Sequence, residues 1–162
     1  LLGDSVECVI DAEKTNKTQL FARISPDGKY LLYTEADYGT FPIWHHEADL
    51  KMMDLQTKEN LNVDILNSSS VESYHSWSSN GRWIVFSSRR IDGLYTRLYL
   101  AYFDEKGNFH KPFLLPQSSA DFDLLRMQSY NIPEFTKGAT KISSREIEKL
   151  LKGGTFPSKL RK

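Results

Sequence analysis

Two stretches of the chain share one pattern of hydrophobic and polar positions. In residues 21–33, FARISPDGKYLLY, an apolar segment is followed by Ser-Pro-Asp-Gly and then by an aromatic and aliphatic run. Pro26 favours the second position of a type I turn, Asp27 can accept hydrogen bonds from the backbone that follows, and Gly28 can adopt the left-handed conformation of a short hairpin loop. The run at residues 29–34 is too short for a helix and predicts a strand buried on both faces.

The same frame returns at residues 75–86, HSWSSNGRWIVF, where Ser78 and Gly81 follow Ser25 and Gly28 at a distance of 53 residues. A repeat of about 50 residues, rich in strands and punctuated by turns, is typical of the blades of a β-propeller. The sequence therefore predicts an all-β fold built from propeller blades.

The repeat divides the chain into four parts. Residues 1–17 are expected to be an edge or connection from a preceding unit, with a strand at residues 5–11. Two four-stranded antiparallel blades follow at residues 18–66 and 74–115. The predicted strands are residues 19–24, 29–34, 48–54 and 60–66 in the first blade and 74–77, 82–88, 97–104 and 109–115 in the second.

The remaining residues, 116–162, are expected to form a C-terminal extension with a short helix. Residues 121–128 are compatible with one, and Ser143 with Glu146 fits a capping box that starts another of about nine residues, ending at Gly153. From Lys137 onward the extension has eight basic and two acidic residues, whereas the rest of the chain is acidic. We therefore expect it to fold back on the blades, burying the apolar stripe of its helix, which consists of Ile147, Leu150 and Leu151.

The frame of residues 25–33, S-P-D-G-[KR]-aromatic-[LI]-x-[FY], resembles the WD40-like repeat of TolB-type β-propellers. Residues 78–86 are a weaker copy, because Ser79-Asn80 stands where Pro-Asp is usual. The resemblance covers about residues 15–135 and implies the propeller architecture, but it implies no particular activity.

The wider sequence is similar to the C-terminal part of exported TolB-like propeller proteins of Bacteroides-type bacteria. The segments that carry this similarity are residues 38–45, 74–78 and 112–116. It implies a location in the periplasm or cell envelope. Because two blades cannot close a ring, we expect this chain to be part of a larger propeller, or to cover its open faces as a homo-oligomer.

Composition narrows the possible functions. The 162 residues include 21 basic and 21 acidic side chains, and a net charge of zero argues against general nucleic-acid binding. No apolar run approaches the roughly 18 residues of a membrane span, so no membrane insertion is expected. Cys8 is the only cysteine, which excludes an internal disulfide and a cysteine-based zinc cluster.

The densest group of possible metal ligands is the segment His45-His46-Glu47-Ala48-Asp49. In an extended conformation His45, Glu47 and Asp49 would lie on one side. The alternative is that Trp44, His45 and Glu47 shape a long loop through packing and hydrogen bonds. We favour the loop, and expect no metal and no other cofactor.

No catalytic residues are predicted. The chain has no G-x-S-x-G nucleophile elbow. His75 precedes Trp77 on an inner strand, where it could act as a base at the central channel, although a structural histidine is favoured. The segment with Arg89, Arg90, Tyr95 and Arg97 could recognise a carboxylate or a peptide, because arginine pairs bidentately with such groups; the alternative is a solvated rim.

Eight residues are thus candidates for ligand binding. They are Trp44, His45, Glu47, His75, Arg89, Arg90, Tyr95 and Arg97. The many aromatic residues of the predicted strands could stack on a ligand, but filling the core between blades is the favoured interpretation.

Two functions remain. The first is a non-catalytic interaction module of the cell envelope that binds a protein, peptide or glycan through propeller loops. The second is the propeller portion of a larger hydrolase of prolyl-oligopeptidase type, whose catalytic domain would need some two hundred further residues. We favour the first, because the blades are followed here by a short basic extension.

Overall fold

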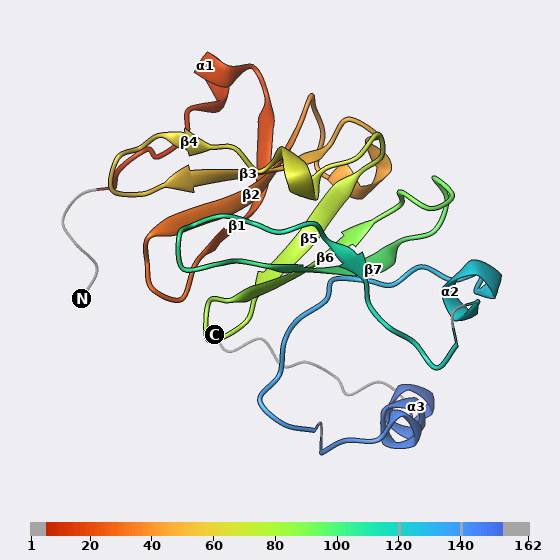
Figure 1. Cartoon of the computed structure of the whole chain (residues 1–162). Helices are drawn as coiled ribbons and strands as arrows, with labels where there is room; N and C mark the ends of the chain where they lie inside the picture. Colours follow the sequence, from red (N-terminus) through yellow and green to blue (C-terminus); the bar gives the residue numbers. More distant parts are fainter. Residues whose placement is uncertain (1–5, 120, 140, 154–162) are drawn as a thin grey trace, which may run out of the picture.

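Eight strands form two four-stranded antiparallel sheets within residues 6–119, 121–139 and 141–153, which the computed structural model describes (Figure 1). In each sheet the strands follow in sequence order. The first sheet contains β1 (Thr18–Ile24), β2 (Tyr30–Ala36), β3 (Asp49–Asp54) and β4 (Asn60–Leu61), and the second contains β5 (Glu72–Trp77), β6 (Trp83–Ser88), β7 (Arg97–Tyr102) and β8 (Phe113–Leu114). The predicted fold class is confirmed.

The helices of the described residues are short. They are α1 (Ala12–Thr15), α2 (Phe122–Leu125), α3 (Ser144–Lys152) and the 3-10 turns η1 (Pro42–Trp44) and η2 (Asp64–Leu66). None of these helices has the length and apolar character needed to cross a membrane.

The two hairpins that carry the repeat share one set of hydrogen bonds. The Ser25 hydroxyl donates to the Asp27 carboxylate at 2.6 Å and accepts from the backbone N–H five residues later at 3.0 Å. The Ser78 hydroxyl donates to the side-chain oxygen of Asn80 at 2.7 Å and accepts from the corresponding N–H at 2.9 Å. Asn80 therefore replaces Asp27 without loss of the turn.

The repeat extends to an irregularity of the first strand in each sheet. The pairing register of β1 with β2 shifts between residues 20 and 23, and that of β5 with β6 shifts between residues 73 and 76. At these bulges Phe21 and Tyr74, 53 residues apart, have φ of 54° and 52°. Their rings pack edge to face at 5.0 Å, so the two bulges bring the first strands of both sheets into contact.

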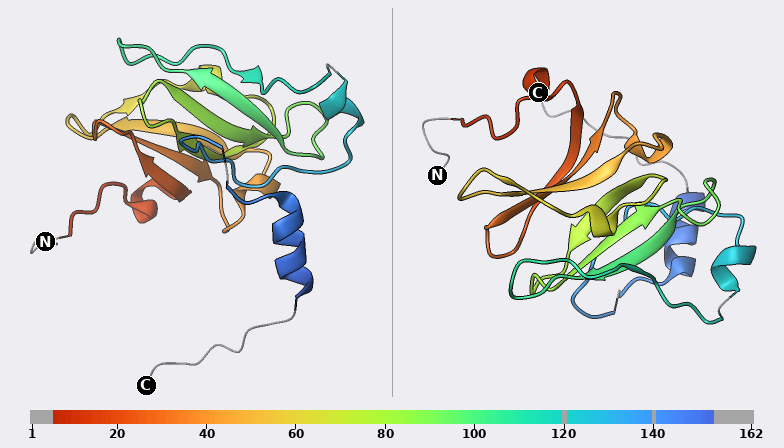
Figure 2. Two further views of the ribbon diagram at one scale, coloured as in Figure 1. Left: turned by 90° about the horizontal axis from the view of Figure 1, so that it is seen from below. Right: turned by 45° about the horizontal axis from the view of Figure 1, so that its top comes forward.

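The main core lies between the two sheets, which are stacked on one another (Figure 2). Leu32, Leu50 and Met52 from the first sheet meet Ile84 and Phe86 from the second. The core interpretation of the aromatic residues is confirmed for four of them, namely Tyr30, Trp77, Phe86 and Tyr99. Tyr33 is buried in a separate small cluster, and Trp83 and Tyr102 are half-buried, with ring centroids 5.1 Å apart.

Several predicted boundaries were wrong. Residues 6–10 contain no strand and lead instead into α1. The predicted strand at residues 60–66 ends after Leu61, because η2 turns Leu66 into the core. The last strand is reduced to β8 and one isolated bridge between Phe103 and Phe109.

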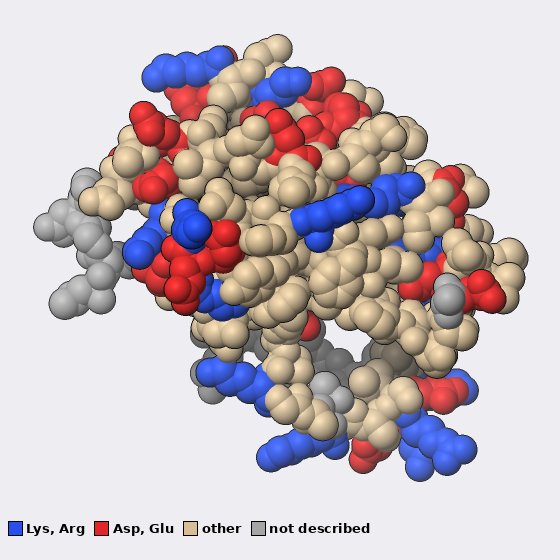
Figure 3. Space-filling model, in the orientation of Figure 1, with Lys and Arg blue, Asp and Glu red and all other residues tan. Residues whose placement is uncertain are grey.

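The helix of the C-terminal extension was predicted correctly, but its position was not. Ser143 and Glu146 form the capping box, and α3 has nine residues. No residue of α3 is buried, and Leu151 is 82% exposed. The helix projects from the sheets (Figures 1 and 2), since a stripe of three apolar side chains offers little area for docking. Basic side chains are frequent around it (Figure 3).

Candidate functional site

Two clefts lie between the sheets, at opposite ends of the strands. In an antiparallel sheet, successive connections between strands lie at alternating ends. The repeat hairpins therefore lie at one end of the two sheets, and the long β2–β3 and β6–β7 connections lie at the other. Each cleft is lined by residues of the strands or of their connections from both sheets.

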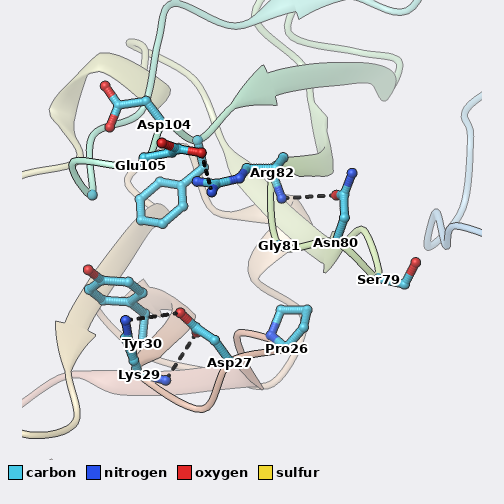
Figure 4. Close-up of a pocket in the computed structure, with 12 residues that line it drawn as sticks. Pro26, Asp27, Lys29, Tyr30, Ser79, Asn80, Gly81, Arg82, Asp104 and Glu105 are labelled. Carbon is cyan, nitrogen blue, oxygen red and sulfur yellow. Dashed lines mark hydrogen bonds and ion pairs between the residues drawn. The ribbon is translucent and has the colours of Figure 1, made fainter.

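The hairpin cleft has a volume of about 390 Å³, and the repeat hairpins face one another across it (Figure 4). Its polar groups bond mainly to their own turns and neighbours. Arg82 pairs with Glu105 at 3.0 Å, and the Asp27 carboxylate accepts from Ser25 and from the backbone of Lys29. Asp104 likewise accepts hydrogen bonds from backbone N–H groups of its own turn. These charges stabilise the hairpins, so this cleft is the weaker candidate.

The second cleft, which we call the Trp44–Arg89 cleft, has a volume of about 370 Å³. It brings together the β2–β3 connection, the start of β5, the β6–β7 connection and the segment after α2. Its lining residues are Ile43, Trp44, Tyr74, Arg89, Thr96, Ser129, Tyr130 and Asn131.

Trp44 reaches this cleft because the first two side chains of η1 are buried in the core and the third is at the surface. Pro42 occupies the start of the turn, where a missing N–H is tolerated, and both Pro42 and Ile43 are buried. Trp44 is 70% exposed. Two buried anchors therefore hold a large aromatic ring at the surface.

Arg89 lies against this ring, with its guanidinium carbon 4.0 Å from the ring centroid. The residue is only 8% exposed, and its Nε is buried without a hydrogen-bond partner. Burial lowers the pKa of the guanidinium, while the nearby charge of Asp92 acts in the opposite direction. The site thus holds a largely buried cation whose Nε is desolvated without a partner.

Asp92 does not neutralise Arg89 directly, because its carboxylate organises the β6–β7 connection. It accepts hydrogen bonds from the backbone N–H groups of Leu94 and Tyr95 at 2.8 and 2.9 Å, and lies 3.6 Å from Arg97. Burial alone would raise the pKa of Asp92, but these bonds and the arginine charges hold it below the ordinary value. The connection that carries Arg89 is therefore well ordered by its own contacts.

Arg97 is fully buried and binds α2 and the segment that follows it. Its guanidinium donates to the backbone carbonyls of Asp123 and Arg126, both at 2.8 Å, and of Gln128 at 3.2 Å. Tyr95 packs against it at 5.3 Å. Arg97 and Tyr95, two predicted binding residues, thus hold the chain that forms one wall of the Trp44–Arg89 cleft.

Arg90 is also engaged within the protein. It forms an ion pair of 2.9 Å with Glu72, a fully buried carboxylate that also accepts from the hydroxyls of Ser68 and Ser88. This group ties the linker between the sheets to β5 and β6. Of the three arginines predicted to recognise a ligand, only Arg89 faces the cleft.

His45 and Glu47 form a pair at 3.2 Å beside the ring of Tyr38, outside the lining of the cleft. Asp49 does not join them, because it begins β3 and lies 3.7 Å from Lys51. Among the described residues, no three His, Cys, Asp or Glu side chains are grouped to hold a metal ion.

His75 lies inside the protein, 1% exposed, and its Nε2 donates to the carbonyl of Leu32 at 2.9 Å. Burial lowers its pKa to about 4, so the ring is neutral at physiological pH. In this position the ring links β5 of the second sheet to β2 of the first.

Sequence reasoning missed the other walls of the cleft. Tyr74 could have been found, because it repeats Phe21 at the same spacing as the hairpins. Burial raises the pKa of its hydroxyl, against the effect of Arg89. Residues 129–131 carried no signal, because they reach the cleft through hydrogen bonds of Ser129 and Tyr130 to the distant Thr96.

Comparisons with known proteins show no family. No protein-family model matches the chain, and no curated protein matches its sequence. A solved structure from a structural and mechanistic analysis of two prolyl endopeptidases is similar over 71% of this chain, with 13% sequence identity and a TM-score of 0.38. The chain covers 23% of that protein's length.

Proposed function

We propose that this chain is a non-catalytic interaction module that binds a peptide or protein segment in the Trp44–Arg89 cleft. One observation carries the proposal: an exposed tryptophan and a largely buried arginine are stacked on one another in the lining of a cleft between two ordered connections. Tryptophan, tyrosine and arginine are the residues that most often dominate binding energy at protein interfaces.

The rigidity of the site supports binding. Trp44 is anchored by its buried neighbours, Asp92 orders the β6–β7 connection, and Arg97 fixes the opposite wall. A site that is ordered before the ligand arrives loses less conformational entropy on binding. The volume of about 370 Å³ would admit one or two side chains of a ligand.

A peptide fits the cleft better than a neutral glycan does, because a neutral sugar brings no charge to Arg89. The alternative function, the propeller portion of a larger hydrolase, would require a catalytic domain beyond these 162 residues. Ligand contact in the cleft is expected in either case.

The test is selection of binders from a displayed library of random twelve-residue peptides against the immobilised chain. Affinities of the selected peptides are then measured by fluorescence anisotropy for the original chain, for Trp44→Ala and for Leu124→Ala. Leu124 is exposed on α2 and lies outside the cleft, so it is the matched control. We expect Trp44→Ala to weaken binding about tenfold or more. The proposal fails if no peptide is enriched, or if binding is unaffected by Trp44→Ala.

A further inference from the structure

Arg89 is a buried cation for which the described part of the chain supplies no anion. Its side chain forms no hydrogen bond and no ion pair there, and its Nε is shielded from water as well. Charged side chains at this depth are normally paired, because desolvation without a partner is costly. Arg90 and Arg97, in the same region of the chain, follow that rule with carboxylate and carbonyl partners.

The contact with Trp44 stabilises the charge of Arg89 but supplies no acceptor for its N–H groups. The ring face attracts the positive charge, but it provides no lone pair to the N–H groups, which lie in the plane of the guanidinium. A planar fork of donors matches the two oxygens of a carboxylate.

Among the described residues, none that lines the cleft is acidic. The carboxylate of Asp92, whose charge raises the pKa of Arg89, is occupied by backbone N–H groups and by Arg97. The lining instead has the uncharged polar residues Thr96, Ser129, Tyr130 and Asn131 and the apolar residues Ile43 and Trp44. The cleft is therefore positive, with an apolar side next to the charge.

We propose that Arg89 binds a carboxylate of the ligand, and that an apolar group beside this carboxylate packs on Trp44. The proposal rests on the proposed function, because it names the chemistry of the ligand that occupies the same cleft. A peptide can supply the carboxylate from its C-terminus or from an Asp or Glu side chain. In both cases the ligand oxygens accept hydrogen bonds from the guanidinium.

The first test compares two small probes on the unaltered chain, so that this comparison does not depend on the folding of a variant. N-acetylphenylalanine, which has a free carboxylate, and its amide are titrated into the ¹⁵N-labelled full chain while the arginine Nε–Hε signals are recorded by NMR. We expect a saturable shift of the Arg89 signal with the carboxylate and none with the amide. The Arg90 signal is the internal control, since its Nε donates to Ser88. The Arg89 signal is assigned by its loss in Arg89→Lys.

The second test uses the selected peptides in three forms: unchanged, with an amidated C-terminus, and with internal Glu and Asp replaced by Gln and Asn. The altered form that lacks the carboxylate bound by Arg89 should bind about 10- to 100-fold more weakly, because a charged hydrogen-bonded partner is lost. Which of the two altered forms is weakened identifies the source of the carboxylate. Arg89→Lys, which keeps the charge and loses the fork, should weaken the unchanged peptide similarly.

These outcomes separate the two proposals. Peptides that bind equally in all three forms, yet depend on Trp44, would overturn the carboxylate proposal and leave the interaction module intact. A shift of Arg89 by N-acetylphenylalanine alone, with no peptide ever selected, would support the anion site and contradict the peptide-binding function. Equal shifts with the acid and its amide would overturn the carboxylate proposal directly.

Discussion

At the scale of the residue, three arginines within nine positions have different tasks because their partners differ. Arg90 is paired with Glu72, Arg97 holds backbone carbonyls, and Arg89 rests on Trp44 and lines a cleft. The sequence could flag all three as carboxylate-binding candidates. It could not separate them, because Glu72, which pairs with Arg90, and the carbonyls of residues 123–128, which bind Arg97, lie 18 to 31 residues away along the chain.

His75 should make the fold sensitive to acid. Its folded-state pKa of about 4 is below the ordinary value of 6.5, so the unfolded chain binds more protons between these limits and stability falls as the pH falls from about 6.5 to about 4. At 1.36 kcal/mol for each pH unit, the full loss is about 3 kcal/mol.

Urea denaturation at pH 7 and pH 4.5 measures this effect. His75→Gln should be less stable at pH 7, but its loss of stability on acidification should be smaller than that of the original chain. His110→Gln is the control, because His110 is exposed. An unchanged pH dependence in His75→Gln would show that the imidazole is not the titrating group.

At the scale of the element, the hairpins were the most predictable part of the fold. Ser, Asp or Asn, and Gly act through local hydrogen bonds and φ values, so their spacing is sufficient to identify the turn. The bulges at Phe21 and Tyr74 were not predictable, because an aromatic residue gives no local signal for positive φ. Contact between the two rings accompanies this conformation.

Asn80→Ala should lower the free energy of unfolding by about 1 kcal/mol. The substitution removes the oxygen that accepts from the Ser78 hydroxyl at 2.7 Å and from the Arg82 backbone at 3.0 Å. Asn80→Asp should retain the stability, because Asp27 makes the same contacts in the first hairpin. Chemical denaturation of both variants beside Ser79→Ala decides the point; equal stability of all three would mean that the glycine alone sets the turn.

Arg97→Ala should cost about 3 kcal/mol or more, because it leaves several buried carbonyls without donors. Hydrogen exchange should rise in residues 121–131, and peptide binding should weaken as this wall of the cleft loosens. Arg82→Ala, which removes an exposed ion pair with Glu105, should cost less than 1 kcal/mol. Slow exchange of residues 121–131 in Arg97→Ala would contradict the role given to Arg97.

In the molecule as a whole, the two-sheet architecture followed from the repeat, whereas the docking of α3 that was expected from the charge of the C-terminal extension is wrong, because no residue of α3 is buried. Opposite net charges on two segments define no contact between them, because exposed charges are screened over about 10 Å. Because the outer faces of the sheets are open, self-association stays a prediction.

The apolar stripe of α3 should contribute little to the stability of the described fold. Ile147→Ser with Leu150→Ser should change the free energy of unfolding by less than about 0.5 kcal/mol, since both side chains are exposed. Thermal and urea denaturation of the double variant measure it. A loss of several kcal/mol would mean that the stripe docks in solution.

If ligand recognition occurs at the long connections rather than at the hairpins, NMR shift mapping with a selected peptide will show it. We predict that the largest chemical-shift changes on addition of the peptide fall on the Trp44 indole, the Arg89 Nε–Hε group and Tyr74. Changes centred on the hairpin cleft, at residues 26–30 and 79–82, would contradict it.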